Sequence, residues 1–260
     1  MTEVLPRAGE ALRPALPPML DASIPSLLAD DRPGRLRLLA GRLLSVAHRI
    51  AGKRKYDDFR LERVLDVRVI VIPGVANPKI LRSGAFFASQ IDARLVGAGA
   101  RVLDLGTGSG VCALRAARHA RRVVATDISA AAVRCTRLNA ALNHLEDRID
   151  VRHGDLFAPL GGERFDLVLF NPPFYLGVPK DDRDAAWRSN DAAQRFAAGL
   201  AERLEPSGVA LVLLSSFGDG CALYESELRA NRFDLAVFAR RRFINETLTI
   251  LRAAPPRMLA

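Results

Sequence analysis

The sequence predicts an α/β fold with a Rossmann-like, mostly parallel sheet of seven strands, helices on both faces and an antiparallel C-terminal hairpin. From residue 101 onward, short apolar runs alternate with longer amphipathic segments. Strands and helices that alternate in this way build a parallel sheet. Two apolar runs, 234–239 and 247–252, then follow each other without room for a helix between them, and this pair predicts the hairpin.

The N-terminal quarter is predicted as a small helical extension. Prolines at positions 6, 14, 17, 18, 25 and 33 indicate a loosely ordered leader over residues 1–34. Apolar residues at positions 36, 39, 43, 44, 47 and 50 recur at helical spacing and predict a helix over 35–50. The run "VRVIVI" predicts a strand over 67–72, and a helix is expected over 83–96. We therefore expect the extension to cover residues 1–65 and a single domain to cover 66–260.

The predicted core elements follow from the same periodicities. The expected strands are 101–105, 123–126, 149–152, 165–170, 209–214, 234–239 and 247–252. The expected helices are 111–119, 130–142, 191–204 and 221–230. The strand over 165–170 ends sharply, because two prolines that cannot donate to a sheet ladder follow it.

Composition and charge narrow the class of protein. The chain has 260 residues, of which 49% are hydrophobic and 26% charged, which excludes global disorder. The net charge of +9 suits a polyanionic partner, although charge bears on association and not on the fold. The three cysteines are widely separated, which argues against a disulfide framework or zinc site. No apolar run approaches the roughly 20 residues of a spanning helix, so we expect a cytoplasmic protein without a membrane partner.

A glycine-rich loop, "VLDLGTGSG" over 102–110, leads from a strand straight into a helix. Its glycines allow a ligand to approach the backbone closely. Asp104 precedes the loop, where a carboxylate can accept a hydrogen bond from an α-ammonium group. Asp127 ends the next strand at a position suited to ribose hydroxyls, and Asp155 follows the third strand, where it can accept from an adenine amino group between Leu156 and Phe157.

These three carboxylates select among ligands. They are expected at the C-terminal ends of successive strands, where open α/β sheets bind their ligands. A diphosphate fits poorly among them, whereas S-adenosylmethionine is cationic and carries no phosphate. The alternative interpretation is that the aspartates cap helices or form turns.

The stretch "NPPFYLG", 171–177, suggests a site for a methyl acceptor beside the donor. Asn171 Oδ1 and the Pro172 carbonyl are hydrogen-bond acceptors that can hold an N–H group, and the prolines make the turn rigid. Phe174 offers a flat face to a planar acceptor, with Tyr175 beside it. The alternative is that Asn-Pro-Pro is only a turn former and that Phe174 belongs to the core.

The motifs "VLDLGTGSG", "ATDIS", "NAALN", "GDLF" and "FDLVLFNPPF" together resemble the "methyltransferase small" group of class I enzymes. This group includes release-factor glutamine N5-methyltransferases and rRNA guanine N2-methyltransferases. The resemblance implies a class I methyltransferase domain over 66–260 that uses S-adenosylmethionine. The implied catalytic residues are Asn171, Pro172 and Phe174. The implied cofactor-binding residues are Asp104, Gly106, Thr107, Gly108, Asp127, Ile128, Asp155, Leu156 and Asn171.

The subgroup, and with it the substrate, stays open. Release-factor enzymes usually have tyrosine where this chain has Phe174, and no N-terminal domain of either subgroup is evident in residues 1–65. The prediction is N-methylation of a planar or amine nitrogen in a protein, a peptide or an RNA base, with a small-molecule amine as an alternative. An NAD-dependent oxidoreductase and an inactive binding protein are the alternatives of other classes. No metal site is predicted, because the four histidines show no ligand spacing.

Overall fold

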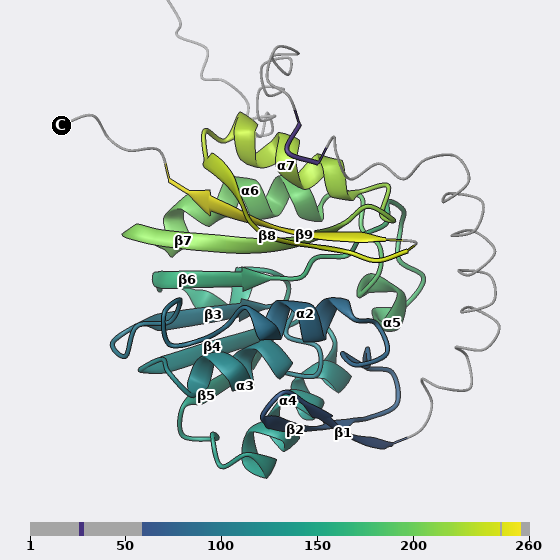
Figure 1. Cartoon of the computed structure of the whole chain (residues 1–260), viewed down its shortest axis with the longest axis vertical. Coiled ribbons are helices and arrows are strands. Elements are labelled where there is room, and N and C mark those ends of the chain that lie inside the picture. The colour runs from purple at the N-terminus through teal and green to yellow at the C-terminus, as the bar shows by residue number, and fades with distance from the viewer. Residues whose placement is uncertain (1–25, 29–58, 245, 256–260) are drawn as a thin grey trace, which may run out of the picture.

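The computed structural model describes residues 26–28, 59–244 and 246–255. The helix predicted over 35–50, and nearly all of the predicted leader, lie outside the described residues. Within the described part, a central sheet carries helices on both faces, as Figure 1 shows. None of the described helices is long and apolar enough to cross a membrane.

The central sheet has seven strands in the order β5-β4-β3-β6-β7-β9-β8. The strands are β3 (Arg101–Leu105), β4 (Arg122–Asp127), β5 (Ile149–His153), β6 (Phe165–Phe170), β7 (Leu204–Ser215), β8 (Asp234–Arg242) and β9 (Thr247–Ala254). All pairings from β5 to β7 are parallel, whereas β9 runs antiparallel to both of its neighbours. The predicted parallel sheet and its C-terminal hairpin are therefore confirmed.

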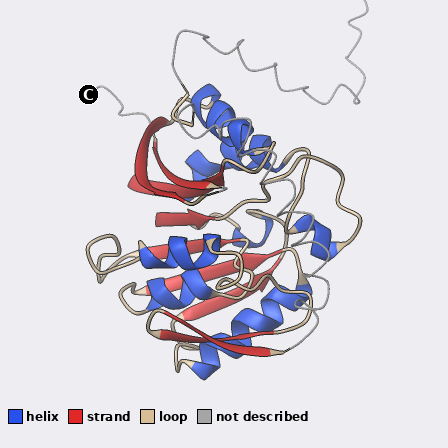
Figure 2. Ribbon diagram, turned by 45° about the vertical axis from the view of Figure 1, so that its right-hand side comes forward, coloured by secondary structure: helices blue, strands red, loops and turns tan. Residues whose placement is uncertain are grey.

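Helices cover the two faces of the sheet (Figure 2). The side chains between the sheet and each helical layer form a separate apolar cluster. One face carries α2 (Ser83–Ser89), α3 (Val111–Ala117) and α4 (Ala130–Leu142). The other carries η2 (Ala158–Leu160), α6 (Ala192–Arg203) and α7 (Cys221–Ala230). The central strands are apolar on both sides, as strands buried between two helical layers are expected to be.

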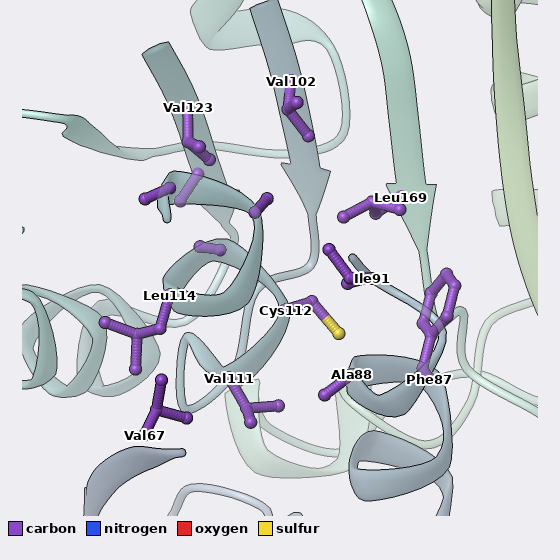
Figure 3. Close-up of a cluster of buried hydrophobic side chains, with 14 of the residues drawn as sticks. Val67, Phe87, Ala88, Ile91, Val102, Val111, Cys112, Leu114, Val123 and Leu169 are labelled. Carbon is purple, nitrogen blue, oxygen red and sulfur yellow. The ribbon is translucent and has the colours of Figure 1, made fainter. Parts of the chain in front are cut away.

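The first cluster joins the sheet to α2 and α3, as Figure 3 shows. Val102, Val123 and Leu169 extend from three neighbouring strands, and Leu114 of α3 lies near them fully buried. Phe87 of α2 and Ile91 just beyond it are fully buried in the same cluster. Burying side chains of this size contributes roughly 1.5–3 kcal/mol each, so this layer fixes α2 against the sheet.

A separate two-stranded hairpin lies against α4 (Figure 1). It consists of β1 (Arg60–Val64) and β2 (Val67–Val71). Asn139 of α4 accepts from the Ile70 amide at 2.7 Å and donates to the Ile70 carbonyl at 2.7 Å. One helical turn later, Asn143 makes the same pair of bonds to Arg68. The motif "NAALN" thus holds the edge of β2 as a neighbouring strand would.

Several elements differ from their prediction. The helix expected over 83–96 ends at Ser89, because Asp92 Oδ1 accepts from the amides of Arg94 and Leu95 and forms a turn. Strand β1 and the short helix α5 (Asp182–Ala185) were not predicted. Strand β7 begins at Leu204, before the predicted start at residue 209, and its first residues pair irregularly with β6. The boundary predicted between residues 65 and 66 falls in the turn of the β1–β2 hairpin, and the division into two domains stays a prediction.

Replacing Asn139 by alanine should lower the free energy of unfolding by about 2–3 kcal/mol. The buried side chain serves three backbone groups, since its amide nitrogen also donates to the Ser109 carbonyl at 2.9 Å. Buried polar groups left without partners cost roughly 1–3 kcal/mol each. Asn143→Ala is the matched control, because its partners at Arg68 are exposed and water replaces the lost bonds. Urea denaturation of both variants should show the larger loss for Asn139→Ala, and equal losses would contradict this account.

Candidate functional site

A cavity of about 480 Å³ opens at the C-terminal ends of β3, β4 and β6. The strand order reverses here, because β4 lies on one side of β3 and β6 on the other. Such a switch point is where open α/β sheets bind ligands. The cavity wall includes nine residues singled out from the sequence: Asp104, Gly106, Thr107, Gly108, Asp127, Ile128, Asp155, Leu156 and Asn171.

The glycine-rich loop forms the floor of this cavity. Gly106, Gly108 and Gly110 all have positive φ, between 58° and 80°. A Cβ on Gly110 would lie 2.8 Å from the Thr136 side chain of α4, so only glycine fits where the loop enters α3. Thr136 also donates to the Gly108 carbonyl at 3.1 Å. The loop is therefore held from two sides, with its open face toward the cavity.

Asp104 is a buried carboxylate at the end of β3. Its Oδ2 accepts from the Thr107 hydroxyl at 2.6 Å and from the Ala113 amide at 3.0 Å. Within the described residues its Oδ1 makes no hydrogen bond, and the residue lines the cavity. Burial raises the pKa of Asp104 to about 7, an effect that the two hydrogen bonds only partly oppose. A cationic group in the cavity could therefore donate a hydrogen bond to Oδ1 of Asp104, while Oδ2 keeps its bonds to Thr107 and Ala113.

Asp127 ends β4 and links the glycine-rich loop to the turn that precedes α4. Its Oδ2 accepts from the Gly108 amide at 2.9 Å and its Oδ1 from the Ser129 amide at 2.8 Å. Burial raises its pKa as well. The residue that caps α4 is Ser129, whose hydroxyl accepts from Ala132. None of the three aspartates is the N-cap residue of a helix, although Asp104 accepts from the Ala113 amide in the first turn of α3. Asp127 does form a turn with Ser129, as the alternative interpretation expected.

Asp155 has a partner that the sequence did not reveal. Both of its oxygens accept from the guanidinium of Arg195, at 2.7–2.8 Å. Arg195 lies in the first turn of α6, also contacts Asp191 at 3.5 Å, and lines the cavity. The four-residue spacing of Asp191 and Arg195 indicates the contact between these two residues, but no local pattern indicates the contact with Asp155. The expected free carboxylate is thus half of an ion pair.

Asn171 follows β6 and lines the cavity. Its Oδ1 is buried and makes no hydrogen bond within the described residues. Leaving a buried acceptor unsatisfied costs roughly 1–3 kcal/mol, and such atoms are concentrated at sites of function. Beneath it, the ring of Phe170 packs on Phe196 at 4.5 Å and near Tyr224 at 5.9 Å. This aromatic group supports the end of β6 from the helical face opposite α2 and α3.

Two of the predicted acceptor residues lie outside the cavity wall. Pro172 is buried, and Phe174 is half-buried against both apolar clusters. The Phe174 carbonyl accepts from the Gly220 amide at 3.0 Å, which joins this loop to the segment after β7. The expected flat face for an acceptor is therefore not part of the cavity, and a catalytic role for Phe174 stays a prediction.

The outer wall of the cavity comes from residues 178–191, a segment that the sequence analysis did not assign to the site. Tyr175 bonds through its backbone to Trp187 and Ser189, and Asn190 Oδ1 accepts from the Gly177 amide at 2.8 Å. These bonds hold the loop closed at its base. No group of three or more His, Cys, Asp or Glu side chains within the described residues could hold a metal ion.

The chain belongs to the methyltransferase small domain family, because residues 66–232 match that family. The resemblance found in the sequence is thus confirmed. The ribosomal RNA small subunit methyltransferase C of Alcanivorax borkumensis is 35% identical over 56% of this chain and 42% of its own length. The release factor glutamine methyltransferase of Gloeobacter violaceus is 32% identical over 65% of this chain and 63% of its own. The chain spans less than two thirds of either relative.

Solved structures show the same fold. The Thermus thermophilus 16S rRNA methyltransferase in complex with AdoMet and guanosine aligns with a TM-score of 0.57 at 24% identity, over 76% of this chain and 50% of that one. A tRNA methyltransferase of M. jannaschii aligns with a TM-score of 0.55 at 19% identity, over 77% of this chain and 57% of that one. The predicted class I methyltransferase fold is confirmed.

Asp104 should make the stability of the ligand-free protein depend on pH. Its pKa is raised from the usual 3.8 to about 7 in the folded state. The stabilising contribution is therefore complete at low pH and is lost as pH rises through about 7. Urea denaturation at about pH 5 and about pH 8 should show a fall in unfolding free energy that Asp104→Asn reduces, since each pKa unit corresponds to about 1.4 kcal/mol. The same fall in the variant would mean that Asp104 titrates normally.

Proposed function

We propose that this chain is an S-adenosylmethionine-dependent methyltransferase that modifies a nitrogen atom. The observation that carries the proposal is the buried Oδ1 of Asn171, which has no partner among the described residues and lies in the wall of a cavity that also contains Asp104 and Asp127. A hydrogen-bond acceptor without a partner suits an N–H group of a substrate. Two carboxylates nearby suit a donor that is cationic. Membership of the methyltransferase small domain family supports both parts.

The residues of the cavity fit S-adenosylmethionine better than a dinucleotide. Asp104 would accept from its α-ammonium group through Oδ1, and Asp127 would accept from its ribose hydroxyls. A diphosphate would instead place its charge beside two buried carboxylates, at a cost that low polarity amplifies. The NAD-dependent alternative is thereby disfavoured. Leu156 and the Asp155–Arg195 pair lie where the adenine would bind, with Ile128 at the edge of the same wall.

The methyl group that reacts is supplied by the bound S-adenosylmethionine, and the chain's own residues position the acceptor. A nitrogen in an amide or a nucleobase amine is a weak nucleophile, because its lone pair is delocalised. Asn171 Oδ1 and the Pro172 carbonyl would accept from its N–H groups and aim the lone pair at the methyl carbon. These acceptors would also stabilise positive charge that develops on the nitrogen as the new bond forms.

The substrate that we propose is a protein or an RNA base. By their names, the two relatives act on ribosomal RNA and on a release factor, and a small-molecule amine is the alternative. The three buried free thiols, Cys112, Cys135 and Cys221, fit a reducing compartment, which supports the cytoplasm. We also propose that residues 66–260 form the methyltransferase domain and residues 1–65 an extension to it.

Asp127→Ala should weaken S-adenosylmethionine binding by roughly 1–3 kcal/mol, because a charged acceptor is removed from the ribose hydroxyls. Asp150→Ala is the matched control, since Asp150 lies on β5 outside the cavity and pairs there with Arg122 and Arg152. Calorimetric titration of both folded variants should show a loss for Asp127→Ala alone. An unchanged affinity of Asp127→Ala for S-adenosylmethionine would show that Asp127 only stabilises the turns at Gly108 and Ser129.

Asn171→Ala should lower methyl transfer by on the order of 100- to 1000-fold while cofactor affinity stays largely intact. Removing one preorganised hydrogen-bonding group at a reacting centre typically has an effect of this size. The loss should appear in turnover more than in KM, because the bond strengthens as the nitrogen reacts. The measurement is single-turnover transfer to the acceptor found by a methyl-label screen of rRNA, tRNA and protein fractions.

The control for this prediction is Asn231→Ala. Asn231 follows α7, bonds to Glu227 of that helix and does not line the cavity. Its removal should leave the transfer rate unchanged. Folded Asn171→Ala protein that transfers methyl groups at the wild-type rate would refute the proposed role of the loop.

A further inference from the structure

The tip of the β8–β9 hairpin lies at the same edge of the sheet as the cavity. Strand β9 runs antiparallel to both β7 and β8, so β8 runs parallel to β7 and β6. The C-terminal end of β8 at Arg242 therefore lies at the edge where β3, β4 and β6 end. Arg241, Leu248 and Ser215 form one row across the three strands.

Two arginines stack on one ring at this tip. The guanidinium of Arg241 lies 5.2 Å from the centroid of Phe243, and that of Arg82 lies 4.8 Å from the same centroid. Arg82 immediately precedes α2 and has a φ of 59°. This backbone conformation is strained for any residue other than glycine. We call Arg82, Arg241, Arg242 and Phe243 the hairpin-tip cluster.

The positive charge of this cluster is poorly compensated. Arg82, Arg241 and Arg242 are exposed, and no carboxylate in the described part of the chain lies within ion-pair distance of them. The acidic group that interacts electrostatically with Arg82 is Glu246, which accepts from the Ser215 hydroxyl. Burial raises the pKa of Glu246, and Arg82 opposes this effect only in part. Ile244 beside the cluster is 85% exposed, so a large apolar side chain lies next to three cations.

The cluster connects directly to the loop that carries Asn171. Thr247 and Ser216 exchange hydrogen bonds at 2.9 Å across the base of the tip. Four residues after Ser216, the Gly220 amide donates to the Phe174 carbonyl, and Asp219 accepts from the Leu176 amide. A long substrate that places one group at Asn171 can thus extend across residues 215–220 to the arginines.

We propose that the hairpin-tip cluster binds the phosphodiester backbone of single-stranded RNA beside the acceptor base, an inference that rests on the proposed methyltransferase function. Guanidinium groups bind phosphate through paired N–H donors, and their flat faces stack on bases. Phe243 aligns two of these groups. A chain with one charge per nucleotide meets several arginines at once, whereas a peptide meets them only where acidic residues cluster. The three arginines of the cluster, Arg82, Arg241 and Arg242, therefore favour RNA over a peptide as the partner.

The test is fluorescence anisotropy with a fluorescein-labelled oligouridylate at increasing salt concentration. Arg241→Ala/Arg242→Ala should weaken binding by on the order of tenfold at low salt. It should also reduce the slope of log affinity against log salt by about 1.4, since each contact with a single strand contributes about 0.7. Phe243→Leu keeps every charge, and it should cause a smaller loss because the stacked arginines lose their alignment.

The matched control is Arg121→Ala/Arg232→Ala, which removes the same charge. These exposed arginines precede β4 and β8, so they lie at the opposite edge of the sheet. Equal losses in both double variants would show that only net charge matters and would overturn the proposal. Polyglutamate that displaces the oligouridylate at equal charge concentration would identify an acidic-peptide surface and overturn it too.

A parallel titration with S-adenosylmethionine separates this inference from the function on which it rests. If the wild-type protein binds the cofactor but not the oligouridylate, the proposed RNA-binding role of the hairpin-tip cluster is wrong and the proposed methyltransferase function is unaffected. Wild-type protein that binds the oligouridylate through the cluster but not the cofactor defeats the methyltransferase proposal. Both double variants should bind the cofactor as the wild type does, because neither pair lines the cavity.

Discussion

Asp104 is buried near the C-terminal end of β3, and the architecture of the cavity follows from the way its carboxylate is satisfied. One oxygen accepts from Thr107 in the glycine-rich loop and from the first turn of α3, so the loop must fold back over the end of β3. That fold requires positive φ at three glycines. Asp127 then accepts from Gly108 and fixes the loop to the neighbouring strand. A cation in the cavity would meet two carboxylates whose burial raises their pKa values, and its binding would favour their ionised forms.

The walls around this centre depend on polar contacts between distant parts of the chain. Asn139 and Asn143 hold β2 on α4, and the chain after β2 supplies Gly74, Val75 and Pro78 to the cavity. Arg195 of α6 joins the opposite wall to Asp155. Phe170 and Phe196 support the strand that presents Asn171. The cavity is therefore built from segments that lie far apart in the sequence, and a few hydrogen bonds or ring contacts hold them together.

The sequence predicted the centre of the site better than its walls. Strand ends are local features, so Asp104, Asp127, Asp155 and Asn171 were assigned to one edge of the sheet from periodicity and spacing. Arg195 was missed because its contact with Asp155 depends on how α6 is rotated against the sheet. Phe174 was expected in the site, yet its ring packs into the apolar clusters, and no local pattern distinguishes the two positions. Helix α2 was expected to be longer because the helical periodicity continues beyond Ser89. The turn at Asp92 ends the helix earlier. The spacing of Asn139 and Asn143 by one helical turn was visible in the sequence, and it was the available signal for the β2 contact.

The two carboxylates should select a cationic ligand without phosphate. Isothermal titration calorimetry of the wild-type chain near neutral pH, in buffers of different ionisation enthalpy, tests this selectivity. With S-adenosylmethionine, we expect binding accompanied by proton release, because an ammonium group beside Asp104 lowers the raised pKa of its carboxyl. Asp104→Asn should reduce that release, and NAD should not bind. Binding of NAD in preference to S-adenosylmethionine would contradict the account.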